Sequence, residues 1–159
     1  MFNKRVKEKD SDAKHALDAA LRLLTRREYS KQELYSKLLL RFEKEAALEA
    51  LRKCVENNWQ SESRYSQMLM NHLINQCYGQ NRIYQEFSKK GVKPEYYRSL
   101  LEECDFLQVA VCFLNKKADR DKCSDYNYRQ KVLSSLARRG FPNSVCLDAL
   151  RAYLSDNIS

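Results

Sequence analysis

Two segments of this sequence are built alike, and they set a repeat length for the chain. Gly79–Pro94 reads GQNRIYQEFSKKGVKP, and Asn127–Pro142 reads NYRQKVLSSLARRGFP. Matching positions lie 49 residues apart: Ile83, Tyr84, Phe87, Lys89, Lys90 and Gly91 correspond to Val132, Leu133, Leu136, Arg138, Arg139 and Gly140. One period earlier, Leu34, Tyr35 and Leu38 occupy the apolar positions. A period of this size predicts an array of repeated supersecondary units.

The repeats are predicted to be helical. Three glycines and two prolines among 159 residues supply too few turns for a many-stranded fold, and good helix formers dominate the composition. We therefore predict an all-α protein of three tandem three-helix repeats, about nine helices in total. The expected bounds are a flexible basic tail over residues 1–12 and repeats over 13–59, 60–105 and 106–159. Because each repeat has little apolar area of its own, stacking should supply the core.

Local signals place the second helix of each repeat. Ser30-Lys31-Gln32-Glu33 has the form of a capping box, in which Ser30 and Glu33 each accept a hydrogen bond from the other's amide. An apolar pair at the positions of a hydrophobic staple flanks the box and recurs one period later: Tyr29 with Leu34, then Tyr78 with Ile83. The sequence therefore predicts helix starts at about residues 31 and 80.

Glycine and proline mark the ends of two helices. Gly91 and Gly140 each follow a basic pair, and glycine adopts the left-handed conformation that ends many helices. Pro94 and Pro142 come shortly afterwards, near the expected start of the next helix, where a missing N–H loses nothing. Both glycines are therefore predicted helix stops.

Aromatic side chains are predicted to serve packing more than recognition. Tyr84, Tyr96 and Tyr97 fall on apolar helix faces, so core or inter-repeat packing is favoured over base stacking. Trp59 follows the first repeat and is expected to pack between that repeat and the next.

The net charge of +8 and the pI of about 9.2 favour an acidic partner: nucleic acid, an acidic protein face or an anionic membrane surface. No stretch approaches the apolar length of a membrane-spanning helix, and the first residues do not have the form of a signal peptide. With no secretion signal, the six cysteines are expected to be reduced in a cytoplasmic protein.

No pattern in the sequence points to catalysis. The two histidines, His15 and His72, are the only side chains that ordinarily titrate near neutral pH. No cluster has zinc-ligand spacing, and no phosphate-binding loop or nucleophile elbow is present. We therefore expect no enzyme activity, no catalytic residue, no metal and no cofactor.

Basic residues near helix ends are the candidate binding residues. They are Arg82, Lys89, Lys90, Arg129, Arg138 and Arg139, together with Arg26 and Arg27 at the expected end of the first helix. One interpretation is structural, because cations near a helix C-terminus are stabilised by the helix dipole. The other is functional: equivalent helix ends in an array face the same side and would form a basic stripe for phosphates or an acidic protein.

Three motifs in order resemble the bacterial RecX family of regulatory proteins. They are Ser30-Lys-Gln-Glu-Leu34 followed by Lys37-Leu38, then Gly79-Gln-Asn-Arg-Ile83 leading into Phe87-Ser-Lys-Lys-Gly-Val92, then Leu136-Ala-Arg-Arg-Gly-Phe141. The resemblance covers about residues 13 to 155. The run Asn58–Tyr65 departs from the family pattern and shares only Glu62 and Tyr65 with it.

The resemblance implies a curved array of three-helix repeats that binds the RecA recombinase, within the groove of the filament that RecA forms on single-stranded DNA. It also implies that the protein limits filament extension, ATP hydrolysis, strand exchange and cleavage of the SOS repressor. On this reading the protein is a monomeric regulator without a membrane segment, and any direct contact with DNA is weak.

Two other classes of function stay open. A direct nucleic-acid-binding protein would also explain the positive charge, since short three-helix units resemble helix-turn-helix domains. It predicts steep salt dependence of binding to bare DNA. A helical-repeat scaffold for an unrelated partner predicts no effect on recombinase activity.

Overall fold

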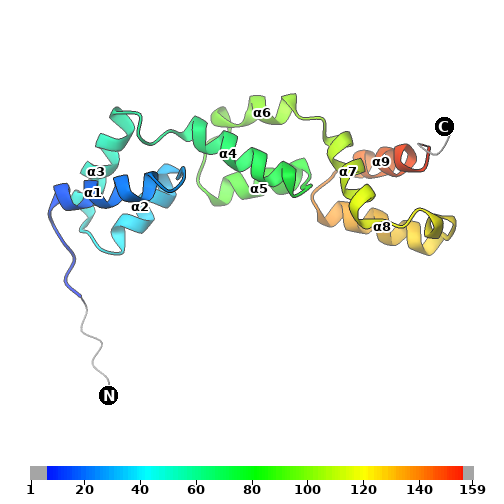
Figure 1. The fold of residues 1–159 in the computed structure, drawn as a ribbon, viewed down its shortest axis with the longest axis horizontal. Helices are drawn as coiled ribbons and strands as arrows, with labels where there is room; N and C mark the ends of the chain where they lie inside the picture. The colour runs from blue at the N-terminus through cyan, green and yellow to red at the C-terminus, as the bar shows by residue number, and fades with distance from the viewer. Residues whose placement is uncertain (1–6, 156–159) are drawn as a thin grey trace, which may run out of the picture. The chain divides into compact units, whose positions relative to one another are not determined.

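The computed structural model of the protein describes residues 7–155, which contain α-helices and no β-strand (Figure 1). This range holds nine α-helices and two short 3₁₀ helices: α1 (Ala13–Leu24), α2 (Lys31–Leu39), α3 (Lys44–Glu56), α4 (Glu62–Asn75), α5 (Gln80–Lys89), η1 (Pro94–Tyr96), α6 (Arg98–Glu103), α7 (Phe106–Lys117), η2 (Asp121–Ser124), α8 (Tyr126–Arg138) and α9 (Asn143–Ser155). The predicted all-α class is confirmed.

The chain folds as two compact units. The first comprises residues up to Ser66 together with Lys90–Val92, and it contains α1, α2, α3 and the start of α4. The second comprises Gln67–Lys89 and the residues from Lys93 onwards, and it contains the rest of α4 and the later helices. The division into repeats over 13–59, 60–105 and 106–159 stays a prediction.

In the first unit, α1 packs against α3 where the buried side chains are small. Ala16 and Ala20 of α1 and Ala47 and Ala50 of α3 are all 0% exposed. The distance between packed helices depends on the side chains at the contact, so alanines allow a close approach. Leu48, which helical spacing assigns to the same apolar face of α3, is instead 45% exposed.

The segment before α1 is held by hydrogen bonds. The amide of Asp10 donates to the carbonyl of Arg41 at 2.9 Å, and the carbonyl of Asp10 accepts from the amide of Glu43 at 2.9 Å. The Asp12 side chain caps α1 by accepting from the amide of Lys14 at 2.8 Å. Asp10 and Asp12 are therefore ordered by hydrogen bonds, which differs from the flexible tail predicted over residues 1–12. Residues 1–6 of that predicted tail lie outside the described residues.

The capping box at the start of α2 is confirmed. The Ser30 hydroxyl accepts from the Glu33 amide at 3.1 Å, and the Glu33 carboxylate accepts from the Ser30 amide at 3.3 Å. Tyr29 and Leu34, the expected staple, are both buried. Local sequence thus determines where this helix begins.

In the second unit, the start of α5 lies against the end of α8. The Gly79 amide donates to the Arg139 carbonyl at 2.8 Å, and the Asn81 amide donates to the Gly140 carbonyl at 3.0 Å. Gly140 has a φ of 96°, which confirms the predicted helix stop. A Cβ on Gly140 would lie 2.5 Å from the backbone nitrogen of Arg82, so the close approach of the two backbones requires glycine.

Two aromatic expectations are corrected. Trp59 is 44% exposed, because the turn after α3 directs its side chain outward while its carbonyl accepts from Arg64 at 3.0 Å. Tyr84 is 52% exposed and meets Tyr97 only edge-on. Tyr97 is buried as expected, and its ring stacks on Phe87 with centroids 4.2 Å apart.

None of the helices between residues 7 and 155 combines the length and apolarity needed to cross a membrane. Within the same residues, no three His, Cys, Asp or Glu side chains come together as metal ligands would. The six cysteines all lie in this range, and none of them forms a disulfide.

Candidate partner-binding surface

Two of the cations selected from the sequence stand at corresponding helix ends of the second unit. Lys89 is the last residue of α5 and Arg138 is the last residue of α8. The Lys89 side chain is 63% exposed and lies 3.3 Å from Glu86, and the exposed Arg138 guanidinium lies 3.3 Å from the Ser135 hydroxyl. Because both cations are themselves exposed and each contacts one side chain among the described residues, both are available to a binding partner.

Lys90, one residue later, belongs to the first unit and is engaged within it. Its Nζ lies 2.9 Å from the Glu33 carboxylate. Its carbonyl accepts from the Ser30 hydroxyl at 3.1 Å. The segment Lys90–Val92 therefore lies on the N-terminus of α2, and Lys90 has a structural role there.

Arg139 makes the corresponding contacts in the second unit. Its Nη2 donates to the carbonyl of Gln76, and its guanidinium carbon lies 4.0 Å from the centroid of the Tyr78 ring. Its carbonyl accepts from the Gly79 amide. Gly79 stands 49 residues after Ser30, and Arg139 stands 49 residues after Lys90. Both units therefore use one construction, in which a basic residue before a glycine stop packs on a helix N-terminus.

The helix-dipole interpretation of the basic pairs thus omitted a tertiary contact. The second member of each pair, Lys90 or Arg139, is directed inward to a partner about 60 residues away in the chain. A signal for it was present in the sequence, since the cap position and the preceding tyrosine recur with the same 49-residue period. The first member of each pair remains exposed.

The remaining two cations selected from the sequence in the second unit, Arg82 and Arg129, also have intramolecular partners. Arg82 Nε lies 3.1 Å from the Glu86 carboxylate, and its guanidinium carbon lies 5.3 Å from the Tyr78 ring centroid. Arg129 donates through Nη1 to the carbonyl of Cys123 at 2.7 Å, which closes the turn before α8. Both side chains are half-buried.

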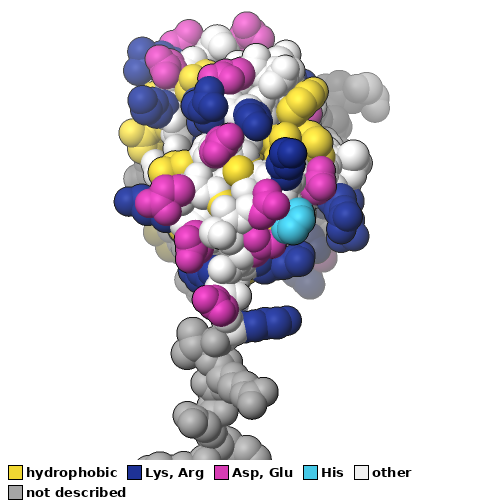
Figure 2. Space-filling view, turned by 90° about the vertical axis from the view of Figure 1, so that its left-hand side faces the viewer, with side chains coloured by type: hydrophobic (Ala, Val, Ile, Leu, Met, Phe, Trp, Pro, Cys, Tyr) yellow, Lys and Arg dark blue, Asp and Glu magenta, His cyan; other side chains and the backbone are white. Residues whose placement is uncertain are grey.

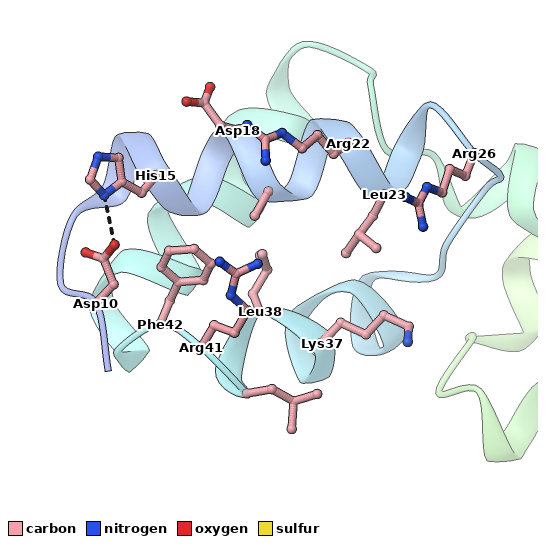
Figure 3. A pocket seen from close by; sticks show the side chains of 12 residues that line it. Asp10, His15, Asp18, Arg22, Leu23, Arg26, Lys37, Leu38, Arg41 and Phe42 are labelled. Atoms are coloured by element: carbon pink, nitrogen blue, oxygen red, sulfur yellow. Dashed lines mark hydrogen bonds and ion pairs between the residues drawn. The ribbon is translucent and has the colours of Figure 1, made fainter. Parts of the chain in front are cut away.

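Arg26 and Arg27 follow α1 instead of ending it, because the helix stops at Leu24 with Thr25 as its cap. Arg27 lies over the Tyr29 ring at 3.9 Å and 3.6 Å from the Glu33 carboxylate. Arg26 is exposed and lines a groove of about 580 Å³ in the first unit (Figure 3).

Three further cations of this groove were not selected from the sequence. Arg22 lies on α1, Lys37 lies on α2, and Arg41 follows α2. The available signal was a spacing of four residues, which predicts Arg22 with Arg26 and Lys37 with Arg41 on one helical face each. In the structure Arg26 and Arg41 lie just beyond the ends of α1 and α2. Figure 3 shows the two pairs on opposite sides of the groove.

The positive charge does not form one uniform patch on the face that Figure 2 shows. Lys and Arg side chains alternate there with Asp and Glu side chains and with small apolar areas. A mixed surface of this kind discriminates between partners by the pattern of their charges.

Glu33 is the most engaged carboxylate of the first unit. Burial by itself raises its pKa, but the hydrogen bonds from Lys90 and from the Ser30 amide, with the charges of Lys90 and Arg27, outweigh burial and lower its pKa below the ordinary 4.5. Burial raises the pKa of the adjacent Tyr65, and the charge of Glu33 raises it further. Tyr65 therefore stays a neutral hydroxyl beside an ionised Glu33.

Glu33→Gln is expected to lower the free energy of unfolding by about 1–3 kcal/mol near neutral pH, because charge-assisted hydrogen bonds are lost. A lowered folded pKa gives stabilisation that is complete above pH 4.5 and is lost as the pH falls through the folded pKa. Urea unfolding near neutral pH and at about pH 3 checks this. The control is Glu56→Gln, which removes an exposed pair with Arg52; equal losses in the two variants would contradict the prediction.

Family profiles, related sequences and solved structures that resemble this protein are all RecX proteins. The profile of the first three-helix domain of RecX matches residues 16–54, and that of the third three-helix domain matches residues 103–150. The regulatory protein RecX of Legionella pneumophila strain Corby is 37% identical over 133 residues, covering 82% of this chain and 89% of the relative. That of Haemophilus influenzae strain PittEE is 32% identical over 140 residues, covering 85% and 92%.

Solved structures agree on the fold. The crystal structure of RecX from Lactobacillus salivarius matches with a TM-score of 0.76 at 22% identity, covering 89% of this chain and 96% of that one. A second crystal structure of regulatory protein RecX matches with the same TM-score at 19% identity. Given relatives above 30% identity along most of both chains, this protein belongs to the RecX family of regulatory proteins.

Proposed function

We propose that this protein binds the RecA recombinase on single-stranded DNA and inhibits filament extension, ATP hydrolysis, strand exchange and cleavage of the SOS repressor, acting as a monomer in the cytoplasm. Membership in the RecX family of regulatory proteins is the observation that carries the proposal. No catalytic residue, metal or cofactor takes part in it.

The arrangement of cations supports a binding role. Lys89 and Arg138 are exposed at corresponding ends of α5 and α8, whereas Lys90 and Arg139 hold the chain together. In this proposal the exposed member of each basic pair approaches phosphate or acidic protein surface on the filament, and the inward member maintains the geometry that presents it.

The test is RecA ATP hydrolysis on single-stranded DNA with this protein added well below the RecA concentration. Inhibition at such amounts supports filament capping, and inhibition only near equal amounts supports coating of the filament. No inhibition, together with salt-sensitive binding to bare DNA, would replace the proposal with direct DNA binding, which the net charge of +8 also favours.

Charge reversal separates the exposed from the structural cations. The double variant Lys89→Glu with Arg138→Glu is expected to raise the concentration for half-maximal inhibition about tenfold while leaving thermal unfolding close to wild type, because both side chains are exposed. Lys44→Glu with Arg151→Glu is the control, since it makes the same charge change at other exposed positions. Equal weakening in both double variants would show that only net charge matters.

A further inference from the structure

The groove of the first unit is a second candidate binding site, separate from the exposed Lys89 and Arg138 of the second unit. It lies between α1 and α2 and has a volume of about 580 Å³, within the range of sites that enclose small molecules or a few side chains. The half-buried Leu23 contributes apolar surface between the two helices (Figure 3). Leu38 and Phe42 also line the groove but are only 1% and 3% exposed. Leu40, which also lines the groove, is 78% exposed.

Four cations surround this apolar surface. Arg22 and Arg26 come from the α1 side, and Lys37 and Arg41 come from the α2 side. Among residues 7–155, no carboxylate oxygen lies within 4.0 Å of their charged nitrogens. Arg82 and Lys90 elsewhere in the chain, by contrast, are each paired with a carboxylate. The four groove cations therefore form no direct ion pair with a carboxylate within the described residues.

The groove also has an acidic end. Asp10 and His15 lie there, joined at 2.8 Å, and Arg26 and Lys37 lie toward the opposite end in Figure 3. Asp18 lines the α1 side. An occupant must therefore bring negative charge to most of the groove and tolerate one carboxylate at the Asp10 end and another on the α1 side.

We propose that this groove binds an acidic peptide segment of a protein partner, one that carries apolar side chains between its carboxylates. Carboxylates of the segment pair with Arg22, Arg26, Lys37 and Arg41, and its apolar side chains cover Leu40 and the surface between the helices. The proposal names the chemistry of the partner segment and does not rest on RecA being that partner.

A nucleic-acid strand fits the same groove less well. Its phosphates would meet Asp10 at the acidic end and Asp18 on the α1 side, and its sugar–phosphate backbone offers nothing apolar to Leu40. Base stacking needs an accessible aromatic face, but Phe42 is 3% exposed and Tyr29 is buried under Arg27. Apolar and anionic groups in alternation are a property of peptides.

The test is fluorescence anisotropy with a labelled synthetic peptide of about twelve residues. Its Leu residues recur every three or four positions, and Glu and Asp fill the positions between them. The full-length protein is expected to bind it, and Arg22→Glu with Lys37→Glu is expected to raise the Kd at least about tenfold. Leu40→Ser is expected to raise it about threefold, because apolar contact is lost without a change of charge.

Matched controls lie nearby in the same unit. Lys14→Glu with Lys44→Glu makes the same charge change at exposed positions of α1 and α3 outside the groove, and Leu48→Ser makes the same apolar-to-polar change at an exposed position of α3. Both are expected to leave the Kd within about twofold of wild type. Circular dichroism confirms that each variant keeps its helices.

Several outcomes would overturn the proposal. The first is no binding by the wild-type protein. The second is equal weakening by Lys14→Glu with Lys44→Glu. The third is tighter binding of a thymidine oligonucleotide that Arg22→Glu with Lys37→Glu abolishes. A dimer in sedimentation that the same double variant dissociates would assign the groove to a second copy of this chain. Peptide binding that appears only after removal of residues 1–6 would assign it to the chain's own N-terminus.

Discussion

Gly140→Ala is expected to destabilise the second unit by about 3–4 kcal/mol, the sum of left-handed strain and overpacking. Gly140 has a φ of 96°, and a Cβ there would lie 2.5 Å from the backbone nitrogen and 3.0 Å from the Cα of Arg82. These are backbone atoms, so no side-chain rotation relieves the clash. A Cβ on Gly79 would likewise meet the backbone of Gly140 and Phe141, so Gly79→Ala should have the overpacking part of this cost without the left-handed strain.

Urea unfolding followed by circular dichroism measures the loss, and hydrogen exchange locates it. The amides of Gly79 and Asn81, which donate to the carbonyls of Arg139 and Gly140, should lose protection first.

Gly91→Ala is the matched control for Gly140→Ala. Gly91 has a φ of 68°, but its Cβ would meet the flexible side chain of Gln32. Gly91→Ala is expected to lower the free energy of unfolding by about 1–2 kcal/mol, from the left-handed conformation alone. Replacing Gln32 by alanine as well should lower it no further. A cost for Gly140→Ala no larger than that for Gly91→Ala would show that the backbone contact in the second unit is not tight.

Phe87→Ala is expected to lower the free energy of unfolding by about 3–5 kcal/mol. Phe87 is 0% exposed, and its ring stacks on Tyr97, itself 1% exposed, at an interplanar angle of 19°. The substitution removes a fully buried ring, leaves a cavity, and removes the aromatic pair, which adds about 0.5–1.5 kcal/mol to such costs.

Tyr84→Ala is the control for Phe87→Ala, because Tyr84 meets the same Tyr97 ring edge-on at 6.1 Å while 52% exposed. Its loss is expected to stay within about 1 kcal/mol. Urea unfolding compares the two variants, and near-ultraviolet circular dichroism reports whether Tyr97 keeps a fixed environment. Equal losses would mean that Tyr84 is buried in solution, as its place in the apolar pattern of the sequence predicts.

Helix starts and stops could be predicted from the sequence because the interactions that make them span few residues. The Ser30–Glu33 capping box closes over three residues, and the stops at Gly91 and Gly140 depend on the conformation of one residue each. The 49-residue period then extended these local predictions to an all-α repeat protein, and the RecX resemblance is confirmed by relatives that span most of the chain.

The orientation of side chains within the apolar pattern was less predictable. Helical spacing placed Leu48 and Tyr84 on packed faces, and it gave no reason to expose Trp59, yet all three are between 44% and 52% exposed. In α3 the alanines occupy the contact with α1, which leaves Leu48 at its edge. Periodicity identifies the buried side of a helix, but the neighbouring helix decides how wide the buried part is.

By itself, the sequence thus determined the helices, their caps, the repeat and the family. The tertiary structure decided which cations are free. Lys90 meets Ser30 across 60 residues and Arg139 meets Gln76 across 63, while Arg22 and Lys37 face one groove from two helices. A charge has the same appearance in the sequence whether its partner is an internal carbonyl or another molecule, because the cost and gain of pairing depend on groups that only folding brings together.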